Sequence, residues 1–176
     1  NGGKKPNKLA KLEGNSNGDV LLLGKASGLG SACSLEIDGK CLTAPFTPSP
    51  LTKAECEAEK GKLGIKECYW GTDYWAGAVK QCGGVSNMPT MADIGKLATE
   101  LYKGNPTVGA KQNVGAELDT SKASSLGFGN SDSFVVWSGG ELGRNDAYSR
   151  YFFQSSTNWS HTSRTYSGTQ AVCVGE

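Results

Sequence analysis

His161 is the only histidine in this sequence, and it lies in the most polar part of the chain. Acyl-transfer catalysis needs a base beside its nucleophile, and glycoside hydrolysis needs two carboxylates that flank the scissile bond. Neither arrangement is indicated, because the residues around His161 are mainly Ser, Thr and Asn and no carboxylate pair follows a predicted strand. The sequence therefore predicts that the protein is not an enzyme.

The histidine belongs to a polar interval between two apolar runs, Phe134–Trp137 and Ala171–Val174. No aliphatic residue occurs between Phe153 and Ala171. A core strand cannot be built from such an interval, whereas a solvated surface can, since aromatic rings give large contact area and Ser and Asn give adaptable hydrogen bonds. We interpret the interval as a displayed binding face held between two buried strands.

The even number of cysteines predicts three disulfides and an oxidising compartment, and therefore an extracellular or cell-surface location. The six are Cys33, Cys41, Cys56, Cys68, Cys82 and Cys173. No pair has the Cys-X-X-Cys spacing of a zinc knuckle or redox motif, so neither a metal nor a cofactor is expected. Spacing alone does not resolve the pairing.

Length and charge narrow the class of protein further. The chain has 176 residues, enough for one domain with an appendage. Its net charge of +1 gives no basic excess for nucleic acid or an anionic membrane. No apolar run is long enough to span a bilayer. The first residue is Asn1 rather than Met, which is consistent with a signal or anchor segment removed upstream.

The first part of the chain is predicted to hold little regular structure. Residues 1–18, rich in Lys, Asn and Gly, are typical of a flexible arm or linker stub. Residues 19–24 (DVLLLG) fit a short buried strand, and residues 44–50 contain three prolines and form a connector.

A hairpin is predicted around Asp38-Gly39. A symmetric hairpin would set Cys41 opposite Glu36, too far from Cys33 for a direct bridge. Either the loop is irregular or the two cysteines pair elsewhere, and we favour an irregular loop closed by a Cys33–Cys41 disulfide.

Three helices with start and stop signals follow the connector. They run from the capping box Thr52–Glu55 to Gly61, from Thr72 or Asp73 to Gly83, and from Thr90 to Gly104. Cys56 on the first helix is expected to pair with Cys68, and a bridge from Cys82 to Cys173 would close the largest loop. Residues 105–130 are predicted to be irregular, and the order of helices followed by short strands indicates an α+β fold.

The second half of the chain resembles a known family. The resemblance is carried by Cys82 at a helix end, the turn Asn87–Thr90 before another helix, Trp137–Gly139, Ala147–Phe152, Trp159 and Ala171–Val174. This order is similar to the C-type lectin-like fold of variable proteins that retroelements diversify. It covers about residues 69–175 and implies short antiparallel strands, two or three helices and a helix-to-last-strand disulfide, Cys82–Cys173.

In that family a reverse transcriptase rewrites template adenines, so chosen codons in the last strands become hypervariable while the fold stays fixed. An Asn codon altered at its adenines reaches Ser, Thr, Tyr, His and Asp but not Trp. Residues 155–169 are almost wholly of the reachable kind, and Trp159 is therefore assigned to the scaffold. The resemblance implies a neighbouring reverse transcriptase gene and an imperfect repeat of the codons for residues 138–174.

The part before the second helix is similar to the globular heads of bacterial pilin-like proteins. This resemblance implies three parts: an arm over residues 1–18, a pilin-like or accessory part over residues 19–68, and the lectin-like domain over residues 69–176. It also implies other pilin-like subunits as possible partners and an N-terminal anchor helix upstream.

Strand alternation predicts which side chains face a partner. Tyr148 and Phe152 are expected to point inward, with Arg150 between them in need of a carboxylate partner or an edge position. Trp137 and Trp159 are expected in the core. The predicted binding face comprises Arg144, Asp146, Ser149, Phe153, Gln154, Ser156, Asn158, Ser160, His161, Ser163 and Tyr166. Among these, Arg144, Phe153, His161 and Tyr166 are the expected energetic anchors.

The favoured function is recognition of a protein or cell-surface ligand, and two alternatives remain. A structural minor pilin would need no special surface over residues 144–166. A calcium-dependent sugar lectin would need Glu-Pro-Asn or Gln-Pro-Asp and Trp-Asn-Asp phrases. The sequence lacks these phrases, and Arg144-Asn145-Asp146 is only a partial match.

Overall fold

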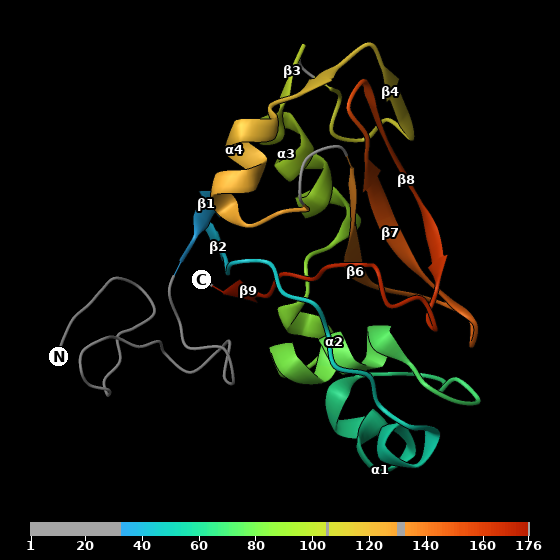
Figure 1. Ribbon diagram of the computed structural model, residues 1–176. Coiled ribbons are helices and arrows are strands. Elements are labelled where there is room, and N and C mark those ends of the chain that lie inside the picture. Colours follow the sequence, from blue (N-terminus) through green and yellow to red (C-terminus); the bar gives the residue numbers. More distant parts are fainter. Residues whose placement is uncertain (1–32, 105, 130–132, 176) are drawn as a thin grey trace, which may run out of the picture.

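The fold is α+β, as predicted. The computed structural model describes residues 33–104, 106–129 and 133–175 (Figure 1). The predicted arm and the strand at residues 19–24 lie outside the described residues. The helices are α1 (Lys53–Leu63), α2 (Tyr74–Cys82), α3 (Met91–Leu101) and α4 (Thr120–Leu126), with a 3-10 turn at Val85–Asn87. The strands are β1 (Leu35–Ile37), β2 (Lys40–Leu42), β3 (Tyr102–Lys103), β4 (Gln112–Val114), β5 (Glu117–Leu118), β6 (Phe134–Leu142), β7 (Asp146–Phe152), β8 (Ser156–Ser163) and β9 (Val174–Gly175).

The main sheet is antiparallel, with strand order β4-β8-β7-β6, so that β7 and β8 are the inner strands and β7 pairs along its length with both neighbours. Helix α3 packs against β6 and β7, while α1 and α2 lie at one end of the molecule (Figure 1). The hairpin of β1 and β2 pairs with β9, which brings residues 35–42 beside the last described strand. Residues from both sides of the expected boundary at residue 69 thus share a sheet.

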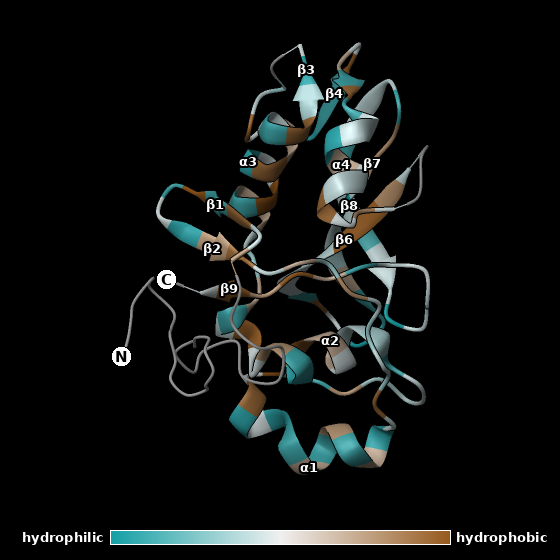
Figure 2. Cartoon of the chain, turned by 60° about the vertical axis from the view of Figure 1, so that its left-hand side comes forward, coloured by the Kyte–Doolittle hydropathy of each residue, from teal (hydrophilic) through white to brown (hydrophobic). Residues whose placement is uncertain are grey.

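Two apolar clusters lie against the main sheet. One joins Trp75 of α2 to Trp137 and Ala147 of the sheet. The other joins Leu97 of α3 to Phe152, together with Val136 and Phe134. Helix α1 contributes few apolar residues to the core and is mostly hydrophilic (Figure 2). Each face of the sheet is therefore covered along only part of its length.

The predicted helix starts are confirmed. Thr52 and Thr90 form capping boxes with Glu55 and Asp93, and Asp73 caps α2 by accepting from the Ala76 amide. Side-chain oxygens satisfy amides that the first helical turn leaves without a partner.

Two predicted helix ends are wrong. Helix α1 runs through Gly61 to Leu63 and is capped by Gly64, whose φ of 81° is the left-handed conformation that glycine adopts easily. Helix α3 ends at Leu101 rather than Gly104, because Tyr102 turns extended and pairs with Leu118.

The segment predicted to be irregular, residues 105–130, contains helix α4. Asp119 caps it and Gly127, at φ 99°, terminates it. Its serines and threonine have weak helix propensity, which hid the pattern.

Two helical glycines differ in their surroundings and give a matched test. A Cβ at Gly77 would lie 1.7 Å from the carbonyl oxygen of Ser49. A Cβ at Gly61 would have no atom of the described neighbouring residues within 4 Å. We expect Gly77→Ala to destabilise by about 1–3 kcal/mol through overpacking. Gly61→Ala should stabilise by about 0.5–1 kcal/mol, because alanine restricts the unfolded chain. Urea denaturation checks both, and changes of the same sign would contradict the packing around α2.

Three disulfides are present: Cys33–Cys41, Cys56–Cys68 and Cys82–Cys173. All three predicted pairs are confirmed, and they indicate an oxidising, extracellular or secreted environment. The expected irregular loop at Cys33 is wrong. The hairpin is regular, with Glu36 opposite Cys41, and Cys33 reaches Cys41 over a Cα–Cα distance of 5.3 Å. Over the described residues, no helix has the length and apolarity needed to cross a bilayer.

Candidate functional site

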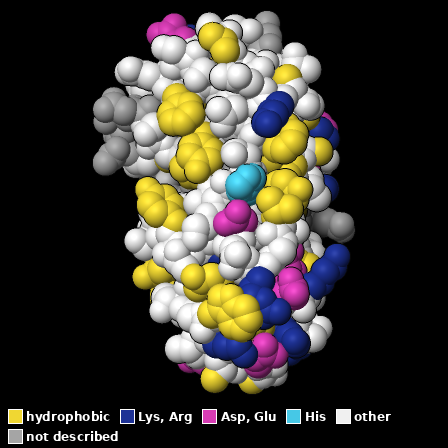
Figure 3. Space-filling view, turned by 90° about the vertical axis from the view of Figure 1, so that its right-hand side faces the viewer, with side chains coloured by type: hydrophobic (Ala, Val, Ile, Leu, Met, Phe, Trp, Pro, Cys, Tyr) yellow, Lys and Arg dark blue, Asp and Glu magenta, His cyan; other side chains and the backbone are white. Residues whose placement is uncertain are grey.

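The polar interval forms β8 and the segment that follows it, beside β7 and β6. A depression of about 440 Å³ lies here, open to solvent. Its lining residues come from three strands and the segment after β8: Val135, Asp146, Tyr151, His161, Thr162, Ser163 and Tyr166. We call this depression the β7–β8 pocket. Figure 3 shows this side of the molecule, where aromatic and other hydrophobic side chains (yellow) surround the histidine (cyan).

Asp146 and His161 form the charged part of the β7–β8 pocket. Nδ1 of His161 lies 3.0 Å from Oδ2 of Asp146, and the two side chains are 52% and 30% exposed. The register places Asp146 opposite Ser163 and His161 opposite Tyr148, so the pair lies diagonally across two hydrogen-bonded strands. A rigid sheet therefore holds both groups in reach of a ligand.

The base of the pocket is a chain of hydroxyl groups. Thr162 Oγ1 lies 2.7 Å from Ser149 Oγ and 3.1 Å from the Tyr151 hydroxyl. Ser149, predicted to face a partner, is instead fully buried. Its place on the inner strand β7, paired with Trp137, puts it beneath the surface, and its role is to position Thr162 and Tyr151.

Further aromatic side chains lie beside the pocket. The Tyr151 ring packs at 5.7 Å from Phe153, which is 39% exposed, and Tyr166 is 51% exposed. Trp159, expected in the core, is only partly buried. It packs edge-on against Tyr148, and Nζ of Lys111 lies 5.5 Å from its ring centre. Tyr148, expected inward, is likewise partly exposed, because α3 covers this face only around Phe152.

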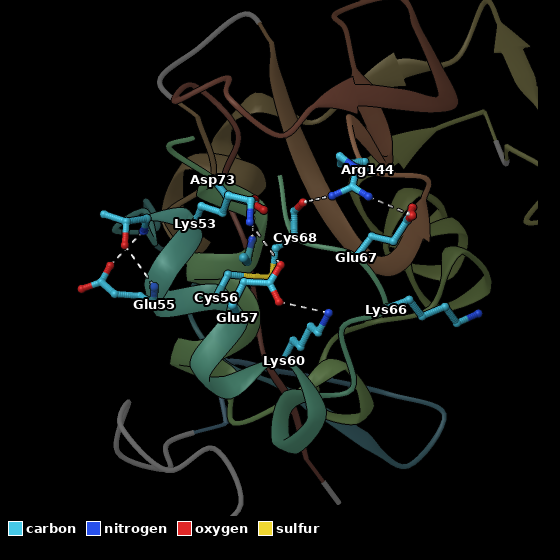
Figure 4. The surroundings of a disulfide bond; sticks show 12 residues. Lys53, Glu55, Cys56, Glu57, Lys60, Lys66, Glu67, Cys68, Asp73 and Arg144 are labelled. Atoms are coloured by element: carbon cyan, nitrogen blue, oxygen red, sulfur yellow. Dashed lines mark hydrogen bonds and ion pairs between the residues drawn. A yellow bond between two sulfur atoms is a disulfide. The ribbon is translucent and has the colours of Figure 1, made fainter. Parts of the chain in front are cut away.

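A second exposed group lies near the β6–β7 turn. The Arg144 guanidinium stacks on the Trp70 ring, 4.3 Å from its centroid. It also donates to the Cys68 carbonyl at 3.0 Å and pairs with Glu67 (Figure 4). Trp70 is 65% exposed. Sequence reasoning missed Trp70, although a tryptophan in a glycine-bounded turn between two helices was a usable signal.

The predicted face residues are only partly brought together. Asp146, His161, Ser163 and Tyr166 line the pocket. Asn158 and Ser160 share the sheet face of Tyr151 and Ser149, which they oppose in the register. Gln154 is exposed in the turn before β8, and Ser156 at its start is partly buried. Tyr151, Thr162 and Val135 line the pocket and were not predicted.

Arg150 has neither the carboxylate partner nor the edge position that was expected. It is fully buried on the inner strand β7, and its Nε donates to Thr157 Oγ1 at 2.9 Å. Within the described part of the chain, its two terminal nitrogens have no hydrogen-bond partner. Burial lowers the pKa of Arg150. Thr157 Oγ1 in turn donates to the carbonyl of Tyr151 at 2.8 Å, so this hydrogen bond reaches the backbone of a pocket residue.

The chain was compared with known proteins in three ways. No family model matches it, and neither the curated proteins nor the solved structures contain a match. The site must therefore be judged by its chemistry. Across the described ranges, no group of three or more His, Cys, Asp or Glu side chains gathers as a metal site would require. The arrangement offers aromatic contact area, hydroxyl groups and one carboxylate on a fixed sheet.

Proposed function

We propose that this chain is a secreted or surface-displayed binding protein that recognises a protein or cell-surface ligand through β7, β8 and the segment that follows. One observation carries the proposal: exposed aromatic side chains and an Asp–His pair surround an open pocket on a rigid sheet. Aromatic residues dominate binding energies at protein interfaces, and rigid ones lose little entropy on binding.

We further propose that the fold is C-type lectin-like and that a retroelement diversifies this face. The position of α2 and α3 before the main sheet, the Cys82–Cys173 bridge and the pairing of β2 with β9 support the fold. Exposed Ser163, Tyr166 and His161 are residue types that adenine mutation of an Asn codon produces. An adenine-specific imperfect repeat of the codons for residues 138–174 beside a reverse transcriptase gene is the expected genomic arrangement.

The binding proposal can be tested with a triple variant of exposed face residues: Phe153→Ser, His161→Ser and Tyr166→Ser. The probe is a panel of recombinant extracellular domains and surface proteins immobilised for biosensor measurement. We expect the natural sequence to bind at least one member and the triple variant to bind it about tenfold more weakly or worse, as the loss of interface anchors does.

The matched control is Lys62→Ser, Lys103→Ser and Glu117→Ser, three exposed positions on α1, β3 and β5. This variant should keep full affinity. If the control variant loses binding and the face variant keeps it, the interface lies on another part of the surface. The absence of any binding that depends on the face would favour the structural minor-pilin alternative.

A further inference from the structure

We propose that the β7–β8 pocket binds a cationic side chain, arginine or lysine, of the partner protein. The inference rests on the proposed function and names the chemistry that the pocket recognises. It comes from the charge of the pocket, from its tyrosine rings and from the partners that nearby cations already have.

Asp146 gives the pocket its negative charge. Among the described residues, no hydrogen bond reaches its carboxylate, and its one close polar contact is His161. A carboxylate pairs with guanidinium through two parallel hydrogen bonds, and with ammonium as a point charge.

The basic residues near the pocket are already paired elsewhere. Arg144 contacts Glu67 and the Trp70 ring. Arg164 is fully buried between Asp73 and Glu141. Among the residues that the structure describes, no lysine or arginine lines the pocket, so these residues supply no fixed cation for Asp146.

The aromatic walls suit the same ligand. Tyr151 and Tyr166 both line the pocket, and in the described structure no basic side chain stacks on either ring. The Tyr166 ring packs so closely on Gly168 that a Cβ there would lie 2.7 Å from its hydroxyl oxygen. Positioned tyrosine faces attract cations through their electron-rich surface. Within the described residues this kind of contact occurs three times, with Arg144 on Trp70, Arg164 on Trp75 and Lys111 over Trp159.

The test is an NMR titration of the intact, oxidised protein with acetyl-arginine methylamide and acetyl-lysine methylamide. Acetyl-citrulline methylamide is the control, because citrulline has nearly the shape of arginine without its charge. At about 50 mM ligand, where interactions weaker than millimolar are populated, we expect saturable shifts at Asp146, Tyr151 and His161 with both cations. Citrulline should give none.

Asp146→Asn should weaken the binding of the arginine amide about three- to fivefold, as expected for an exposed ion pair. Glu117→Gln is the matched control, since it removes one negative charge at an exposed position away from the pocket. It should leave the shifts unchanged, and well-dispersed spectra verify folding of both variants.

Equal shifts with citrulline, no saturable shifts at all, or arginine binding unaffected by Asp146→Asn would overturn the inference. These outcomes differ from failure of the proposed function. If the triple variant loses the protein ligand but the natural protein does not bind the cationic amides, the proposed function stands and the cation pocket is rejected.

Discussion

Replacing Arg164 by methionine is expected to destabilise the protein by about 3–5 kcal/mol, the typical cost of breaking a buried ion pair. Arg164 is fully buried, and its guanidinium lies 2.9 Å from the Asp73 carboxylate and 3.3 Å from Glu141. It also donates to the carbonyls of Gly143 and Glu67. The substitution leaves Asp73 buried without its positive partner, and this desolvated charge carries most of the loss.

Arg144→Met is the matched control. Arg144 also contacts a carboxylate, a backbone carbonyl and a tryptophan ring, but it does so at the surface. An exposed pair of this kind contributes about 0–1 kcal/mol. Urea denaturation at neutral pH should therefore separate the two variants clearly. Equal losses, or a loss below about 1 kcal/mol for Arg164→Met, would mean that the buried network around Asp73 is not formed.

Arg164 also explains how the polar interval is held in place. It follows the last residue of β8, and its contacts reach the N-cap of α2 and the segment before it. Glu141, its second partner, accepts hydrogen bonds from the amides of Lys66 and Glu67. The exposed pocket residues thus stand on a strand whose end is fixed by buried charges.

Local signals in the sequence predicted local structure well. Thr52, Asp73 and Thr90 each supply an oxygen to amides three residues on, and this capping depends only on neighbouring residues. Asp38-Gly39 likewise adopts the two positive φ angles that a tight hairpin needs. Arg164 carries no such signal, because its partners lie 23 and 91 residues away along the chain.

The proposed binding face was harder to predict because burial varies along a strand. The alternation of side chains along β7 correctly predicts that Ser149 and Tyr151 lie on one face of the sheet and Arg150 and Phe152 on the other. However, α2 and Trp137 cover one face near Ala147, while α3 covers the other near Phe152. Each face is buried at one end and open elsewhere, so Ser149 is buried although Tyr151 lines the pocket.

Removing the Cys82–Cys173 disulfide by a double Ala substitution is expected to destabilise by about 4.5 kcal/mol. The bridge joins residues 91 apart and ties the end of α2 to the segment before β9. Restricting so large a loop lowers the entropy of the unfolded chain by that amount in the chain-entropy account. Both cysteines are fully buried, so cavity formation adds to the loss.

The Cys56–Cys68 pair is the matched comparison, because it is equally buried but spans only 12 residues. Its double Ala variant should lose about 3 kcal/mol by the same account. Denaturation of both variants, with far- and near-ultraviolet circular dichroism to confirm the native fold, gives the difference. A Cys82–Cys173 loss no larger than the Cys56–Cys68 loss would show that loop size does not set the stability of this fold. In that case the long bridge would matter for placing the last strand beside β2 rather than for restricting the unfolded chain.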